Sequence, residues 1–156
     1  EDSWDKGHMA PKADMKWSIQ AYEESFYLSN ICPQNHQLNA GDWLKTENLA
    51  RRIAEEYKKI YIVCGPVFKD RKFGTLGENN VWIPDGFFKA LLVFSGTTYE
   101  SIGFYMSNEP QQNKLRTYVT TVDDIEKLIS RDLFISLEDK LEDVVEGRVN
   151  YSFWGI

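Results

Sequence analysis

The chain has 156 residues, of which 42% are hydrophobic and 14% aromatic, and this composition argues for one packed domain and against a disordered tail. No apolar run approaches the ~20 residues of a membrane-spanning helix, so a membrane span is excluded. The net charge of −6 argues weakly against a nucleic-acid partner. That charge lies entirely in residues 76–156, because basic and acidic side chains balance in residues 1–75. A neutral half with basic clusters can face phosphate, and ordinary solvated charge explains the clusters equally well.

The first half of the chain predicts a strand, a helix and a second strand. We expect the strand at 26–31, followed by a turn at CPQN, and the helix at 42–59. A buried strand is expected at 60–68, ending at a Gly-Pro pair. The helix prediction rests on apolar residues at helical spacing, and these are Trp43, Leu49, Ala50, Ile53, Ala54 and Tyr57. Trp43 is expected in the core rather than as a platform for base stacking.

The second half predicts three more strands and two helices. The strands are expected at 79–84, 87–94 and 101–106, and residues 116–120 lead into a helix at 121–129. Thr121 is the predicted N-cap of this helix, and an acidic helix follows at 137–146. Because strands and helices mix without regular alternation, the predicted class is α+β, in a single domain covering 1–156.

Cysteine and histidine are scarce in the chain. Cys32 and Cys64 stand in apolar, strand-like surroundings that favour buried free thiols, while a disulfide and the redox compartment stay open. His8 ends the stretch Asp-Lys-Gly-His, and near neutral pH an imidazole can act as a base, an acid or a metal ligand. Without further context it is as easily structural. His36 is predicted to be an exposed loop residue.

Further motifs follow His8 in a fixed order. Ala10-Pro11 and Ser-Asn-x-x-Pro-Gln at 29–34 come first, then Leu38-Asn39, Trp43, Glu47 and Arg51. Later stretches are CGPVF, IPDGFFK, VDDIEKL and the terminal WGI. This ordered set resembles the DNA/RNA non-specific endonucleases, the ββα-metal and endonuclease G-like nucleases, over essentially the whole chain.

The resemblance implies a fold and an activity. The implied fold is a ββα-metal finger on a central, mainly antiparallel sheet with flanking helices. Family members carry several strands before the motif, so we expect this chain to be the C-terminal part of the family domain, which contains the catalytic motif. The implied activity is Mg²⁺-dependent hydrolysis of DNA and RNA with little sequence preference, leaving 5′-phosphates, with Mn²⁺ as a substitute ion. A catalytically impaired nucleic-acid-binding fragment is the alternative, and the acidic second half alone suggests a protein-interaction module.

The resemblance also bears on partners and compartment. Besides the nucleic-acid substrate, the resemblance allows two protein partners. These are a second copy of the chain, in a homodimer, and a separate N-terminal segment of the same protein. The compartment stays unknown, with an extracytoplasmic or secreted bacterial protein favoured over a mitochondrial one.

The resemblance assigns the chemistry to four residues. His8 would be the general base, and Asn39 the direct Mg²⁺ ligand through its amide oxygen. A metal-bound water would protonate the leaving group. Glu47 would reach a metal-bound water, and Arg51 would clamp the scissile phosphate. Two alternatives stay open: Asn39 as the N-cap of the helix, and Glu47 with Arg51 as an ordinary i,i+4 pair.

Four other residues receive supporting roles. Lys6, Asn30 and Gln34 are predicted to bind substrate, although Asn30 and Gln34 could instead orient the finger. Lys6 stands where the family has arginine, so it keeps the positive charge but loses the planar fork. Asp5 is expected to brace the finger.

Overall fold

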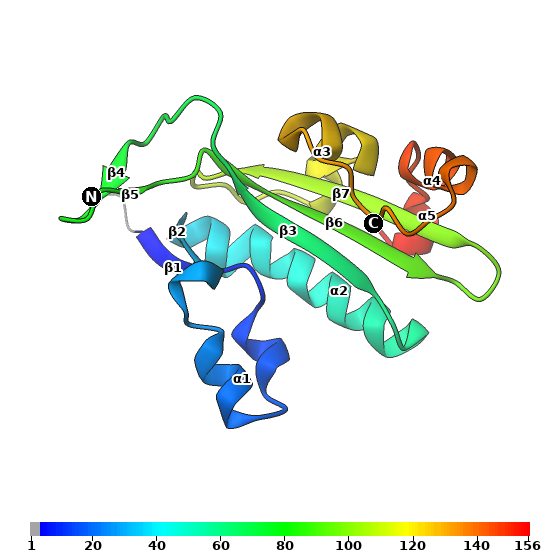
Figure 1. The fold of residues 1–156 in the computed structure, drawn as a ribbon, viewed down its shortest axis with the longest axis horizontal. Coiled ribbons are helices and arrows are strands. Elements are labelled where there is room, and N and C mark those ends of the chain that lie inside the picture. Colours follow the sequence, from blue (N-terminus) through cyan, green and yellow to red (C-terminus); the bar gives the residue numbers. More distant parts are fainter. Residues whose placement is uncertain (1–3) are drawn as a thin grey trace.

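The computed structural model describes residues 4–156 and is built around a four-stranded antiparallel sheet (Figure 1). The strands are β3 (Tyr61–Val67), β6 (Gly86–Phe94), β7 (Tyr99–Ser107) and β8 (Val119–Thr120), and they lie in that order across the sheet. The long strands β6 and β7 pair over their whole lengths, from Gly86 opposite Ser107 to Phe94 opposite Tyr99. The predicted α+β class and antiparallel sheet are confirmed.

Helices cover both faces of the sheet, and the alternation of side chains along β6 explains why. Phe87 and Leu91 belong to the core that α2 (Leu44–Tyr57) covers, while Phe88 and Ala90 pack with α3 (Val122–Ile129). Figure 1 shows α2 on one side of the sheet, with α3 and α4 (Asp139–Glu146) on the other. The last helix, α5 (Tyr151–Trp154), buries its tryptophan in the core on the α2 side.

A separate two-stranded sheet carries the first motif. Strand β1 (Trp4–His8) runs antiparallel to β2 (Ile31–Asn35), and the helical segment that ends in α2 follows β2 directly. The order strand, strand, helix is the predicted ββα finger. Residues between the two strands form the short helices η1 (Lys12–Met15), α1 (Ile19–Glu24) and η2 (Leu28–Asn30), which project from the finger (Figure 1).

Short elements complete the chain. Strands β4 (Thr75–Leu76) and β5 (Val81–Trp82) form a small hairpin between β3 and β6, and η4 (Leu115–Tyr118) precedes β8. The Asp85 carboxylate accepts hydrogen bonds from the backbone N–H groups of residues 69–72 and so fixes the entry to this loop. Among residues 4–156, no helix has the length and apolar character that a bilayer crossing requires.

Several predicted boundaries are wrong, most clearly at 26–31. That segment is a turn and a 3₁₀ helix, and the strand begins where it was predicted to end, at Ile31. Leu28 is 88% exposed, so the apolar composition there does not reflect a buried strand. The Asn30 side chain instead bonds Ala10 and the carbonyl of Ser25, which holds a compact turn.

The other differences are smaller. The helix predicted from residue 42 begins before Leu38, with a π-helical turn at Leu38–Trp43, and of the expected strand 79–84 only Val81–Trp82 forms. The remaining strands and the two later helices lie within about two residues of their predicted bounds, and residues 119–120 of the segment leading into α3 form the short strand β8. Thr121 caps α3 as predicted, since its hydroxyl oxygen accepts from the Asp124 N–H at 3.2 Å, and Trp43 is completely buried.

Candidate active site

His8 lies at the end of β1 with its ring held in one orientation. Its Nδ1 is 3.2 Å from the carbonyl oxygen of Lys6, and its ring packs edge-on against Phe26 at a centroid distance of 4.7 Å. Because a carbonyl can only accept, Nδ1 must carry the hydrogen, so in the neutral ring the lone pair is on Nε2. Nε2 is buried and has no hydrogen-bond partner within residues 4–156. The side chain therefore presents an unused basic nitrogen.

The pKa of His8 is shifted in the direction that keeps this nitrogen neutral. Burial lowers the pKa of His8 below its ordinary 6.5, and the positive charge of Lys12 lowers it further, while the hydrogen bond to Lys6 opposes both. The imidazole is therefore predominantly unprotonated at neutral pH, as a general base must be.

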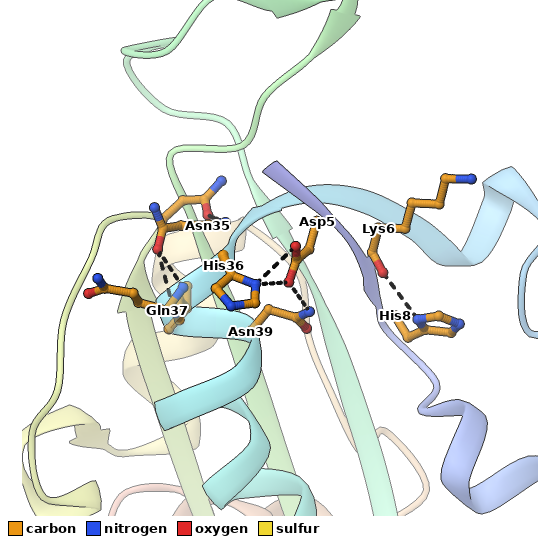
Figure 2. Close-up of polar contacts among 9 residues, drawn as sticks. Asp5, Lys6, His8, Asn35, His36, Gln37 and Asn39 are labelled. Atoms are coloured by element: carbon orange, nitrogen blue, oxygen red, sulfur yellow. Dashed lines mark hydrogen bonds and ion pairs between the residues drawn. The ribbon is translucent and has the colours of Figure 1, made fainter. Parts of the chain in front are cut away.

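Asp5 joins β1 to the first turns of the helix (Figure 2). Its carboxylate accepts from Asn39 Nδ2 at 2.8 Å and contacts His36 Nδ1 at 2.9 Å. His36 is exposed as predicted, although it lies in the first helical turn rather than in a loop. The predicted bracing role of Asp5 matches these contacts, which connect the strand to the helix that follows β2.

Asn39 is not the helix cap, so that alternative is wrong. Asn35 caps the helix instead, because its Oδ1 accepts from the backbone N–H groups of Gln37 at 3.0 Å and Leu38 at 3.4 Å. Asn39 lies inside the π-helical turn, a feature common at functional sites. Its Nδ2 bonds Asp5, and its Oδ1 faces away from Asp5 without a hydrogen bond from any residue that the structure describes (Figure 2).

Glu47 and Arg51 form a pair, and both have additional neighbours. Arg51 Nη2 lies 3.3 Å from Glu47 Oε2, while its Nε lies 2.5 Å from Asp14 Oδ1 and its Nη1 donates to Asn48 at 2.8 Å. The predicted i,i+4 pair of Glu47 and Arg51 is therefore present, but the distance from Arg51 to Asp14 is shorter than the distance from Arg51 to Glu47. Gripping a phosphate would require Arg51 to exchange Asp14 for substrate.

The charge of a buried lysine, Lys89, acts on Glu47. Lys89 is only 2% exposed, and its Nζ lies over the Trp43 ring at 4.2 Å from the centroid. The Glu47 side chain is 11% exposed, and burial raises its pKa, while the positive charges of Lys89 and Arg51 oppose that rise. The alternation along β6 turns Lys89 toward α2, so this cation partly compensates the buried carboxylate.

Of the three residues predicted to bind substrate, Asn30 is hydrogen-bonded within the protein and Gln34 is buried. The Asn30 amide makes three hydrogen bonds, two with the backbone of Ala10 and one with the Ser25 carbonyl. Gln34 is completely buried against Gly7, where any Cβ would collide with the glutamine side chain. These hydrogen bonds favour the orienting role for Asn30. The amide nitrogen and oxygen of Gln34 have no hydrogen-bond partner within residues 4–156, so both roles of Gln34 stay predictions.

Lys6 is exposed, and its side chain points away from Asp5 (Figure 2). It makes no ion pair with any residue in the described range 4–156, and its predicted partner is the substrate.

The donor set fits a hard divalent cation. An amide oxygen without a partner and a buried carboxylate, those of Asn39 and Glu47, both come from the helix of the finger, and oxygen donors are what Mg²⁺ prefers. His8 Nε2 is a further buried polar atom without a hydrogen-bond partner among residues 4–156. The fold and this set of side chains agree with the ββα nuclease site that the resemblance implies.

The chain belongs to the DNA/RNA non-specific endonuclease family, a family of metal-dependent nucleases, whose profile matches residues 1–143. It is 32% identical over 136 residues to human mitochondrial endonuclease G, and 32% identical over 141 residues to the zebrafish mitochondrial nuclease EXOG. A solved structure of an EndoG/EndoGI complex aligns with 88% of this chain at a TM-score of 0.81 and 24% identity, which shows the fold.

The chain spans less than half of these curated relatives, 46% of the human protein and 41% of the zebrafish one. It spans 62% of the aligned EndoG structure.

Proposed function

We propose that this chain is the catalytic part of a Mg²⁺-dependent endonuclease that hydrolyses DNA and RNA with little sequence preference, leaving 5′-phosphates, and that Mn²⁺ can replace Mg²⁺. The observation that carries the proposal is the orientation of His8, whose Nδ1 is committed to the Lys6 carbonyl and whose Nε2 is free. Family membership and the antiparallel finger support it.

His8 performs the first chemical task in this proposal. Its Nε2 takes a proton from water as the water oxygen bonds to phosphorus, and the bond from phosphorus to the 3′ oxygen breaks. The departing 3′ oxygen must gain a proton, which leaves a 3′ hydroxyl and a 5′-phosphate. Nε2 is covered in the protein alone, so a neighbouring group would have to move before water could reach it.

Asn39, Glu47 and Arg51 supply the electrostatic part. Mg²⁺, when bound, neutralises charge on the phosphoryl oxygens, and it would be held by the Asn39 amide oxygen with Glu47 accepting from its water shell. Because the Asn39 amide nitrogen donates to Asp5, its oxygen and not its nitrogen would be available to the cation. Arg51 gives the scissile phosphate a bidentate donor once it leaves Asp14.

The test is digestion of supercoiled plasmid and single-stranded RNA by the purified chain in Mg²⁺, with and without EDTA. We expect both substrates to be cut in Mg²⁺ and neither in EDTA, and we expect the DNA products to be ligatable because they carry 5′-phosphates. Cleavage that persists in EDTA would contradict the metal requirement. No cleavage together with a salt-dependent gel shift would favour a binding fragment, an alternative that the short span relative to the relatives makes worth testing.

Lys6 provides a separate prediction about substrate affinity. On a His8→Ala background, where substrate survives, Lys6→Ala should weaken binding to all sequences and flatten the dependence of log K on log salt by about one phosphate contact. Lys6→Arg should retain or raise affinity, because arginine adds a planar fork. Lys140→Ala is the matched control, since it removes the same charge from the opposite face of the sheet. An unchanged slope for Lys6→Ala would remove Lys6 from the binding surface.

A further inference from the structure

Two surface cavities adjoin each other beside α2 and η4, next to the candidate active site. The larger has a volume of about 900 Å³ and the smaller a volume of about 360 Å³, and Lys45 and Gln112 line both. The smaller cavity extends to His36, and the larger extends along the segment that carries Lys114 and Arg116. Because the two cavities share lining residues, they form one continuous surface, which we call the basic groove.

The basic groove is positively charged. Its cations are Lys45 from α2 and the pair Lys114 and Arg116. Of the aspartate and glutamate side chains in residues 4–156, only that of Asp42 lines the groove, and it is completely buried and paired with Lys45 at 2.6 Å. Lys114 and Arg116 are exposed and make no ion pair with any residue that the structure describes. Two uncompensated cations therefore face any ligand in the groove.

Buried and stacked contacts hold the groove in shape. Asp42 accepts from the backbone N–H of Asn113 at 2.9 Å, which ties the loop before η4 to the helix. Lys45 Nζ donates to Asp42 at 2.6 Å and to the Asn113 carbonyl at 2.8 Å, so one of its three donors is left for a ligand. The Arg116 guanidinium lies over the Tyr151 ring at 4.3 Å from the centroid. These contacts place the cations before a ligand binds, which lowers the entropic cost of binding.

The groove begins at the finger. His36, which lines the smaller cavity, contacts the Asp5 carboxylate at 2.9 Å, and the same carboxylate accepts from Asn39 at 2.8 Å. Figure 2 shows these three side chains together, with His8 on the far side of Asp5. A nucleic-acid strand whose scissile phosphate lies at His8 therefore reaches the groove by passing Asn39 and His36.

We propose that the basic groove binds the sugar–phosphate backbone of the substrate strand on one side of the scissile phosphate, and that Lys114 and Arg116 each contact a phosphate. This inference rests on the proposed function, because it takes nucleic acid as the ligand of the finger. Lysine, arginine and side-chain amides such as that of Gln112 are common donors to phosphate and sugar, and such contacts carry no sequence information. The groove therefore strengthens binding of long strands without adding a sequence preference.

Binding of a single strand of about 20 nucleotides tests the groove. The Kd is measured in EDTA on a His8→Ala background for the double variant Lys114→Ala/Arg116→Ala. The matched control is Lys127→Ala/Arg131→Ala, which removes one lysine and one arginine beside α3, across the sheet from α2. We expect the groove variant to bind at least ~10-fold more weakly at about 0.1 M salt, and its slope of log K against log salt to flatten by about 1.4, the value for two single-strand phosphate contacts. The control should change both quantities far less.

The length of the strand separates the groove from the finger. The loss of affinity should shrink as the strand is shortened, and it should be absent for the shortest strand that the background protein binds, because that strand occupies the finger alone. An equal loss at every length would place the effect in the finger and overturn the proposal. Equal affinities and slopes for the groove variant and the control would also overturn it.

Circular dichroism melts check that the groove variant is folded. If it is not, Lys114→Glu against Lys127→Glu gives the same comparison, because both side chains are exposed. Failure of the proposed function is a separate result, since this binding assay requires neither cleavage nor metal. A parent chain that does not cut in Mg²⁺, together with the expected loss in the groove variant, would support the groove in a nucleic-acid-binding fragment.

Discussion

Replacing His8 with alanine should lower the rate of plasmid cleavage by at least ~10²-fold, as expected for loss of a general base. The fold should survive, because His8 stands at the end of a two-stranded sheet, and within residues 4–156 its side chain makes one hydrogen bond, to the Lys6 carbonyl two residues away. Metal binding should also survive, since within residues 4–156 no hydrogen bond joins the side chains of His8 and Asn39. The measurement is the initial rate of nicking at fixed Mg²⁺, with circular dichroism melts of both proteins.

Added imidazole gives a sharp control for the same variant. If the loss is a loss of proton acceptance at Nε2, free imidazole should restore part of the rate to His8→Ala and leave the parent unchanged. A variant that cuts at the parent rate would show that His8 is not the base, and the interpretation of the Asp-Lys-Gly-His stretch would fail with it.

The pH dependence follows from the direction of the pKa shift. Burial and Lys12 lower the pKa of His8 below 6.5, so the neutral base persists to lower pH than it would in an exposed histidine. Activity should therefore decline only as the pH falls below about 6.5. A cation bound nearby would lower the pKa of His8 further, and this would move the acidic limb of the pH–activity profile to lower pH. Lys12→Ala should move the limb upward. A limb that lies above 6.5 in the parent would contradict the neutral, buried imidazole described here.

The sequence predicts the fold best where one physical signal dominates. Strands β6 and β7 are long apolar runs between turn residues, and their predicted bounds differ from the observed ones by at most two residues. Segment 26–31 has a similar composition, but the Asn30 side chain offers the backbone local hydrogen bonds that compete with a strand. The short helices α1 and α5 have too few turns to show helical periodicity, so no prediction includes them.

The residues of the candidate site also differ in how far the sequence predicts them. The motifs indicate His8, Asn39, Glu47 and Arg51, because their order and spacing resemble the family. Their partners Asp14 and Lys89 could not be assigned from the sequence, since contact depends on how η1 and β6 pack against α2. Of these two partners, only Lys89, the final lysine of IPDGFFK, stands out in the sequence, because it is a charged residue in the middle of an apolar strand. Asp14 gave none.

Replacing Asn39 with alanine should abolish cleavage at moderate Mg²⁺, because it removes the uncharged oxygen proposed to bind the cation directly, an oxygen that has no competing hydrogen bond within residues 4–156. The same change also deletes the donor to Asp5, so a purely structural loss must be separated from a loss of metal. A ligand role predicts that the Mg²⁺ concentration for half-maximal rate rises by at least ~10-fold, with activity partly restored at high Mg²⁺. A bracing role predicts a lower Tm and a lower maximal rate at an unchanged Mg²⁺ midpoint.

Gln37→Ala is the matched control, since it removes an exposed amide from the same helical turn and should change neither quantity. An Mg²⁺ midpoint in Asn39→Ala equal to that of Gln37→Ala would assign Asn39 to the bracing of Asp5 alone.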